Sequence, residues 1–396
     1  MKNTTSYLKK YQPGSHFLQI PGPTNIPNRI LRAISKPIID HRGPDFAQLT
    51  LSLLDRLKQL FKTSSHVFIY PSSGTGVWEA ALVNILSPGD KILAFETGHF
   101  TTLWKNIASK LGLEVEFVPG DWRSGVNPKM VEEKLLQDTE KQIKAIQIVH
   151  NETSTGVTSR IREIRQAMDR VNHPALLLVD AISSLGCTDY NHDEWGVDVT
   201  ISASQKGLML PPGLGFHAVS NKALEAAKTS KFPKTYWDWN PILENNEKGF
   251  FPYTPATNLL FGLDEALSML FEEGLENVFE RHNRLAAATR SAVDAWGLEN
   301  LCENSEEYSN STTAVLMPDS CNADELRQII LARFNMSLGT VLGKVKGKVF
   351  RIGHLGDFNE LMLAGTLSGI EMGLSLAGVP HKKGGINAAL ETLRKS

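Results

Sequence analysis

One lysine, Lys206, follows a strand-like apolar run and precedes a loop rich in glycine and proline. The stretch 199–216 reads VTISASQKGLMLPPGLGF. Lysine is rare at the mouth of a buried strand, because taking its charge out of water is costly unless a neutral amine is wanted for chemistry. A solvated surface lysine is the ordinary alternative at such a position. Lys206 is the candidate nucleophile of the chain.

A carboxylate, Asp180, stands at the end of another apolar run, 175–179. Such a group could keep the nitrogen of a bound pyridine ring protonated, which makes the ring an electron sink. The alternative is an aspartate that only caps the N-terminus of a following helix. Thr153 and Phe100 follow neighbouring strand-like runs. They could supply a hydroxyl group and an aromatic face to the same ring.

A phosphate site is predicted where the run 66–70 gives way to PSSGTGVWEAALVNIL. Small residues between a strand and a helix leave backbone N–H groups free at the helix N-terminus, where the helix dipole also favours an anion. The pattern is not a dinucleotide fingerprint, because Glu79 takes the place of the third glycine, and it lacks the Gly-Lys-Ser/Thr of a Walker loop. The alternative is a glycine turn that binds nothing.

An alternation of strand-like and helix-like runs positions these residues. The candidates stand just past the carboxyl ends of strands, where open α/β sheets bind their ligands. The sequence therefore predicts an α/β fold with a large, doubly wound, mainly parallel sheet. We expect strands at 66–70, 91–96, 114–118, 145–149, 175–179 and 198–202, and helices at 46–61, 99–110, 128–137 and 161–170.

The length of the chain, 396 residues, predicts two domains, because single cores stop growing at about 250–300 residues. An arginine inside the short apolar run 348–352, Arg351, needs either a bidentate anion or a structural salt bridge. We expect an N-terminal arm over 1–15, a large domain over 16–262, a smaller α+β domain over 263–380, and a polar tail with a weak helix over 381–396.

Composition argues against several classes of partner. A net charge of −2, from 41 basic and 43 acidic residues, shows no bias toward nucleic acid. The apolar runs are strand-sized and shorter than the roughly 18 residues of a membrane span. The N-terminus lacks the apolar core of a secretory signal. Cys187, Cys302 and Cys321 have neither disulfide-framework nor zinc spacing. We expect a cytoplasmic protein that binds no metal, membrane or nucleic acid.

Several motifs together resemble the class V, fold-type I aminotransferases, which use pyridoxal 5′-phosphate. They are SSGTGVWEAAL, HNETSTGV, VDAISSLG, SASQKG, FPYTP and RIGHLGD, and the similarity runs from about residue 16 to residue 380. Within the family the motifs are most similar to those of serine–glyoxylate aminotransferases. The resemblance implies transfer of the amino group of a small amino acid, L-serine first, to glyoxylate. Aspartate–glyoxylate, alanine–glyoxylate and phosphoserine aminotransferases of the same fold remain open alternatives.

The resemblance also implies a role for each matching residue. Lys206 would hold the cofactor covalently, Asp180 would pair with the ring nitrogen, and Arg351 would bind the substrate carboxylate. Arg42 could meet the second carboxylate of a dicarboxylate donor. Because the family completes its phosphate site from a neighbouring subunit, a homodimer is implied. The other implied cofactor contacts are Ser73, Gly74, Thr75 and Gln205 at the phosphate, Phe100 on the ring, Thr153 at its hydroxyl group, and Tyr253 and Thr254 from the second subunit.

Two other enzyme classes are excluded because the residue that their chemistry needs is missing. A hydrolase with a Ser-x-x-Lys nucleophile would need a serine three residues before Lys206, where the chain has Ala203. A cysteine desulfurase of the same fold would need a cysteine in the loop before Arg351, and the stretch 338–348 contains none.

Overall fold

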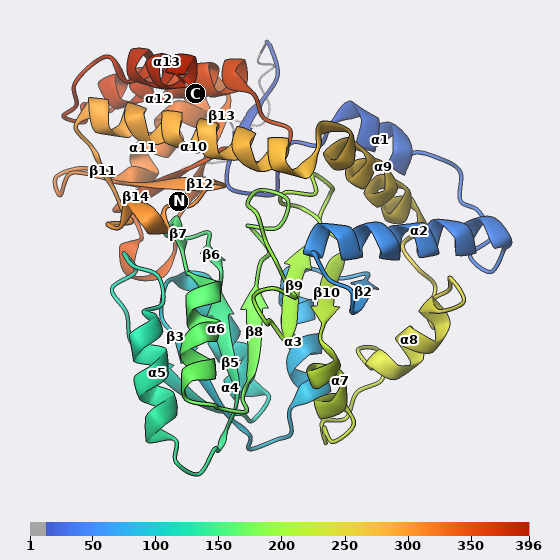
Figure 1. Ribbon diagram of the computed structural model, residues 1–396. Helices are drawn as coiled ribbons and strands as arrows, with labels where there is room; N and C mark the ends of the chain where they lie inside the picture. The colour runs from blue at the N-terminus through green and yellow to red at the C-terminus, as the bar shows by residue number, and fades with distance from the viewer. Residues whose placement is uncertain (1–12, 396) are drawn as a thin grey trace.

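Two β-sheets of different size organise the chain, which the computed structural model describes over residues 13–395. Figure 1 shows the larger sheet in the lower half of the molecule and the smaller one at the upper left, beneath helices α10, α12 and α13. Most of the arm predicted over residues 1–15 lies outside the described residues.

The larger sheet has seven strands in the order β2-β10-β9-β8-β5-β3-β4. Neighbouring strands run parallel except at β10, which is antiparallel to both β2 and β9. The predicted mainly parallel, doubly wound sheet is therefore confirmed, and β10 is the strand that the sequence analysis missed. The strands are β2 (His66–Tyr70), β3 (Lys91–Phe95), β4 (Glu114–Val118), β5 (Ile143–Val149), β8 (Leu176–Asp180), β9 (Val199–Ala203) and β10 (Gly215–Val219).

Helices cover both faces of this sheet, because alternate side chains of each strand enter two different cores. In β2, Val67 and Ile69 belong to one core, and Phe68 and Tyr70 belong to the other. The first core contains side chains of α2 (Pro44–Phe61), α5 (Pro128–Gln137), α6 (Ile161–Arg170) and α9 (Thr257–Glu273). The second contains side chains of α3 (Gly74–Ile85), α4 (His99–Lys110), α7 (Asn221–Ala227) and α8 (Trp239–Asn246).

The smaller sheet has five strands in the order β1-β13-β14-β12-β11. Its first strand, β1 (Phe17–Gln19), pairs in parallel with β13, so residues 17–19 lie in the smaller sheet although the predicted large domain begins at residue 16. A strand of three residues is too short to show its partner in the sequence pattern. The other elements are β11 (Glu299–Asn300), β12 (Thr312–Leu316), β13 (Met336–Thr340), β14 (Val349–Gly353), α11 (Ala323–Phe334) and α12 (Glu360–Leu376).

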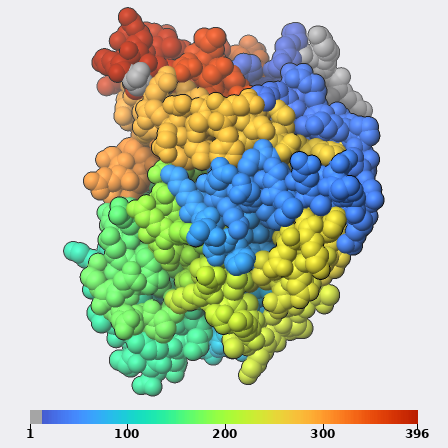
Figure 2. All heavy atoms as spheres, turned by 45° about the vertical axis from the view of Figure 1, so that its right-hand side comes forward, coloured from blue at the N-terminus to red at the C-terminus, as the bar shows by residue number. Residues whose placement is uncertain are grey.

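Two consecutive helices, α9 and α10 (Leu275–Trp296), join the two sheets and are separated at Gly274. The predicted domain limit at residue 262 falls inside α9. Side chains through Val278 still belong to a core of the large sheet, whereas those from Leu285 onward belong to the core of the small sheet. In Figure 2 the orange surface of α10 runs from the red C-terminal helices toward the blue N-terminal segments.

The predicted polar tail contains a helix, α13 (Gly385–Lys395), that packs against α10. Ala389 is buried, and a side chain at Gly385 would collide with the indole of Trp296. The end of the chain therefore belongs to the core of the smaller domain. Between residues 13 and 395 no helix has both the length and the apolar character to cross a membrane.

Candidate active site

A cavity of about 240 Å³ lies at the carboxyl ends of β5 and β8, beside the N-terminus of α3. This is the edge at which parallel α/β sheets bind ligands. The fold brings residues from six separate parts of the sequence together around it. The predicted residues that line it are Ser73, Gly74, Thr75, Phe100, Thr153, Asp180, Gln205 and Lys206.

One end of the cavity is suited to a phosphate group. No side chain caps α3 at Ser73, and its first turn holds no acidic residue. A side-chain carbon at Gly74 would lie 2.5 Å from Ile182 Cδ1, so glycine is required for the close packing of this turn. Gln205 Oε1 is buried and has no hydrogen-bond partner within residues 13–395. Free helix N–H groups and an unsatisfied amide fit the phosphate of the predicted cofactor.

Lys206 lies in the turn after β9, with its amine inside the cavity wall. The amine donates a hydrogen bond to the carbonyl of Pro21. Gly22, at φ +93°, passes so close that a side-chain carbon there would lie 2.4 Å from Lys206 Cδ. Burial, reinforced by the charge of Arg351 and opposed by Asp180, lowers the pKa of Lys206 to about 7. A large share of the amine is then neutral near pH 7, as a nucleophile or base requires.

Asp180 ends strand β8 and faces the cavity. Burial raises its pKa to about 7, and the charge of Glu152 acts in the same direction. The backbone N–H of Ile182 donates to Oδ1 at 2.7 Å, and the indole of Trp78 donates to Oδ2 at 3.0 Å. Both bonds favour the carboxylate form. A buried carboxylate of this kind fits the cationic ring nitrogen of the predicted cofactor, because the ring supplies the opposite charge.

Arg351 comes from β14 of the smaller sheet and is largely buried. Its Nη1 donates to the Thr153 carbonyl at 2.7 Å, and its Nε donates to the Thr340 carbonyl at 3.0 Å. Burial lowers its pKa to about 10. Backbone carbonyls, and no carboxylate of residues 13–395, are its hydrogen-bond partners. The structural salt bridge considered from the sequence is therefore absent from the described residues, and the guanidinium suits a substrate carboxylate.

Two residues of the site were missed by the sequence analysis. Trp78 lines the cavity in the second turn of α3, and its ring meets Phe100 edge-on at 6.5 Å between centroids. Glu152 is fully buried and accepts hydrogen bonds at the N-terminus of α4 from Thr101 N at 3.1 Å and from Ser154 Oγ at 2.6 Å. Glu152 thus holds the turn that carries Phe100. The only sequence signal was an acidic residue within the polar run after a buried strand.

Four predicted residues, Arg351, Tyr253, Thr254 and Arg42, are not among the residues that line this cavity within the single chain. Tyr253 donates its hydroxyl to the Thr235 carbonyl at 2.6 Å and stacks on Tyr236 with ring centroids 4.6 Å apart. Thr254 and Arg42 are exposed. Their roles, which depend on a second subunit or on a second carboxylate, stay predictions.

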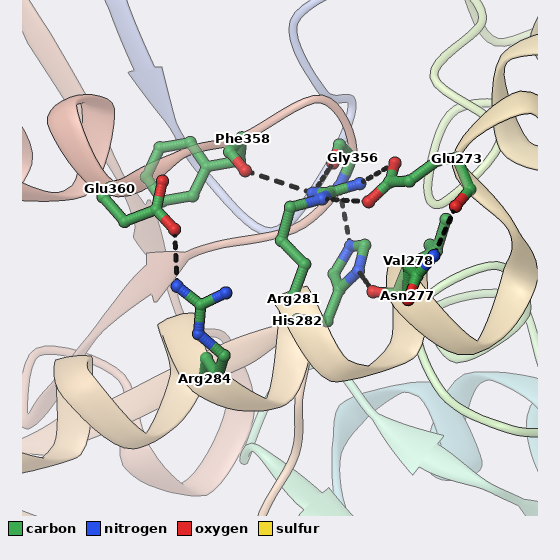
Figure 3. Close-up of polar contacts among 9 residues, drawn as sticks. All are labelled: Glu273, Asn277, Val278, Arg281, His282, Arg284, Gly356, Phe358 and Glu360. Atoms are coloured by element: carbon green, nitrogen blue, oxygen red, sulfur yellow. Dashed lines mark hydrogen bonds and ion pairs between the residues drawn. The ribbon is translucent and has the colours of Figure 1, made fainter. Parts of the chain in front are cut away.

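The loop that follows Arg351 is fastened to α10, as Figure 3 shows. Gly356 N donates to His282 Nε2 at 3.1 Å. Arg281 Nη1 donates to the carbonyls of Gly356 at 2.8 Å and Phe358 at 3.1 Å. The same guanidinium pairs with Glu273 through two bonds of 2.6 and 2.9 Å. One arginine therefore connects the end of α9 with the loop after β14.

This loop also contacts the segments beside Lys206. A side-chain carbon at Gly356 would lie 3.3 Å from Met209 Cγ and 3.4 Å from Thr24. Met209 N and Thr24 Oγ1 both donate to the Lys206 carbonyl, at 2.9 and 3.4 Å. The loop that follows Arg351 in one sheet thus lies beside two residues that bind the turn of Lys206 in the other.

Known proteins share this architecture. The model of the aminotransferase class-V family matches residues 16–339. A serine–glyoxylate aminotransferase of Arabidopsis thaliana is 50% identical over 384 residues, 96% of each chain. An L-aspartate–glyoxylate aminotransferase of Paracoccus denitrificans is 43% identical over 379 residues, 95% of this chain and 96% of its own. The solved structure of pyridoxamine-pyruvate aminotransferase from Mesorhizobium loti has a TM-score of 0.90 at 26% identity, covering 97% of this chain and 99% of that one.

These matches extend over both sheets and over all the segments that meet at the cavity. They confirm the fold-type I architecture and the family expected from the sequence motifs. The turn at the start of α3, the carboxylate of Asp180 and the amine of Lys206 each fit one part of the family's cofactor. This chain belongs to the class-V aminotransferases, and its cofactor is pyridoxal 5′-phosphate.

Proposed function

We propose that this aminotransferase moves the amino group of L-serine to glyoxylate, giving 3-hydroxypyruvate and glycine. The observation that carries the donor class is Arg351, a buried guanidinium whose hydrogen bonds go to backbone carbonyls. One such fork suits a donor with one carboxylate. The choice of serine is supported by the 50% identical Arabidopsis relative, which is named for that reaction.

Each residue of the candidate site has its own role in the proposed reaction. When bound, pyridoxal 5′-phosphate supplies an aldehyde and a ring that accepts the electron pair left on the substrate α-carbon. The start of α3 and Gln205 bind the phosphate, and Asp180 holds the proton on the ring nitrogen. Arg351 binds the donor carboxylate. Lys206 would remove the α-proton of the donor in the first half-reaction, for which its amine must be neutral, and would supply a proton to the α-carbon of the product glycine in the second.

The alternative donors differ in the charge or polarity that they bring to the site. Aspartate and phosphoserine carry a second anion, whose burial without a partner costs several kcal/mol. Arg42 is the residue that we propose as a second cation, and it is exposed in the single chain. Aspartate is nevertheless the strongest alternative, because the 43% identical Paracoccus relative is named for it. Alanine lacks a hydroxyl group, so a polar pocket built for serine would discriminate against it.

We also propose that the enzyme is a homodimer in the cytoplasm. Tyr253 and Thr254 lie away from the cavity of their own chain, which fits a role in the cavity of a neighbour. The cysteines Cys187, Cys302 and Cys321 are unpaired, which suits a reducing compartment.

The test is the specificity constant for each donor with glyoxylate as the common acceptor. We expect kcat/KM to be highest for serine and lower for alanine, aspartate and phosphoserine. Arg351→Lys should reduce kcat/KM for every amino acid, because a point charge cannot reproduce the bidentate fork. A higher value for aspartate that Arg42→Ala removes selectively would overturn the serine proposal and leave the family and cofactor unchanged.

A further inference from the structure

Trp78 occupies a place between the phosphate-binding turn and the carboxylate of Asp180. It lies in α3, one helical turn beyond Gly74, so the same helix holds the phosphate site and the indole. The ring is 2% exposed, stacks on Trp104 with centroids 5.8 Å apart, and lines the cavity. Its Nε1–H donates to Asp180 Oδ2 at 3.0 Å.

Within residues 13–395, each oxygen of Asp180 accepts one hydrogen bond. Ile182 N donates to Oδ1 at 2.7 Å, and the Trp78 indole donates to Oδ2. Donors on separate oxygens fix the rotation of the carboxylate plane, and each oxygen keeps a lone pair for a further bond. We propose that Trp78 is a positioning residue that aims Asp180 at the ring nitrogen of the cofactor and keeps it ionised there. This inference rests on the proposed role of Asp180.

The electrostatics of the cavity make this one bond important. Burial disfavours the ionised form of Asp180, and the charge of Glu152 acts in the same direction. The bonds from Ile182 and Trp78 and the charge of Lys206 act in the opposite direction. Burial outweighs these opposing influences and raises the pKa of Asp180 to about 7, so losing the bond from Trp78 would favour the protonated form further.

The chain contains a matched control. Trp104 is fully buried and lies nearly parallel to Trp78, at an interplanar angle of 14°. Its Nε1 has no hydrogen-bond partner among the residues that the structure describes. Trp78→Phe and Trp104→Phe therefore remove the same volume from the same aromatic stack. Only the first removes a hydrogen bond to Asp180.

The experiment compares the binding of pyridoxal 5′-phosphate with that of its 1-deaza analogue, which has carbon in place of the ring nitrogen. Apoenzymes of the wild type, Trp78→Phe, Trp104→Phe and Asp180→Asn are titrated at pH 7, and the ratio of the two dissociation constants is measured. This ratio reports only on the ring nitrogen, because both ligands share the phosphate and the aldehyde. A general loss of packing weakens the binding of both ligands and leaves the ratio of their dissociation constants unchanged.

We expect Trp78→Phe to lower the wild-type preference for the natural cofactor roughly tenfold, the effect of one hydrogen bond to a buried charge. Trp104→Phe should keep the wild-type ratio of the two dissociation constants, and Asp180→Asn should lose most of the preference for the natural cofactor. If Asp180→Asn loses the preference and Trp78→Phe keeps it, the inference about Trp78 is overturned. If Asp180→Asn itself keeps the preference, the proposed role of Asp180 fails first. Trp78→Tyr, which also lacks the indole N–H, replaces Trp78→Phe if that variant does not fold.

Discussion

Replacing Arg281 by methionine should destabilise the enzyme and displace Arg351, the arginine that we propose for substrate binding. The guanidinium of Arg281, whose side chain is 18% exposed, donates to the carbonyls of Gly356 and Phe358 and pairs with Glu273. Each charged hydrogen bond to a carbonyl contributes roughly 1.5 kcal/mol or more. The pair with Glu273 adds about 1 kcal/mol, since that carboxylate is 34% exposed and partly screened. We expect a loss of about 3–5 kcal/mol in the free energy of unfolding.

A second residue of the same helix provides the control. Arg284 pairs with Glu360 at 2.7 Å, and these side chains are 29% and 44% exposed. Figure 3 shows this pair, which joins α10 to the first residue of α12. Partly exposed pairs contribute about 0.2–1 kcal/mol. Loss of the Glu360 pair should therefore cost Arg284→Met much less stability than the loss of two carbonyl bonds and one ion pair costs Arg281→Met.

Denaturation of both holoenzymes in urea, followed by circular dichroism, measures the stability difference. Steady-state kinetics measures the second effect. Because the Gly356 loop follows Arg351, Arg281→Met should raise the KM for serine several-fold, while cofactor affinity changes little. Equal losses of stability in the two variants would refute the estimate. An unchanged KM in a clearly destabilised Arg281→Met would refute the mechanical link between this loop and Arg351.

Two further predictions concern Lys206 and the subunit interface. Because the pKa of Lys206 is lowered from 10.5 to about 7, the unfolded chain binds more protons than the folded apoenzyme between those pH values, and stability rises with pH there. Apo Lys206→Met has no amine at this position and lacks this rise. The free energy of unfolding of the variant, measured in urea, should therefore exceed that of the wild type by more at pH 7 than at pH 9. An equal difference at the two pH values would contradict the lowered pKa of Lys206. Sedimentation should detect a dimer at assay concentration, and mixing Lys206→Ala chains with Thr254→Ala chains should restore one intact site per mixed dimer. A fully active monomer would exclude the shared site.

Regular alternation of strands and helices made most of the large sheet predictable. Strand β2 and helix α4 begin and end at the predicted residues, because each is a continuous apolar or periodic run bounded by turn residues. Strand β10 follows the loop of Lys206 directly, without an intervening helix, and pairs with β2 from the other end of the domain. Its place depends on that distant partner. The same holds for β1, whose three residues pair with β13.

The site residues show the same difference between features set by the local sequence and features set by distant partners. Lys206 and Asp180 stand at strand ends, so their meeting follows from the parallel sheet itself. Trp78 lies in an ordinary helical sequence, and its bond to Asp180 joins residues 102 positions apart. Glu152 acts on the N-terminus of α4 from the segment after β5. Such residues belong to the site through partners that the folded chain brings to them, and no local pattern distinguishes them from core or surface residues.

Three ionisable side chains of the candidate site, Lys206, Asp180 and Arg351, are largely removed from water. Burial lowers the pKa of Lys206 and of Arg351 and raises that of Asp180. Each shift has the sign expected when a charge leaves water without a full partner. In the roles that we propose, the family's cofactor would bring a ring cation for Asp180 and an aldehyde for the Lys206 amine, and an amino acid would bring an anion for Arg351. Burial of these groups makes an unpaired charge costly, because the dielectric constant of the site is low. The same low dielectric constant strengthens the attraction between opposite charges, so burial also strengthens each of these contacts. Selection for one carboxylate follows from the same physics, since a second anion entering this cavity would itself be a buried charge in need of a partner.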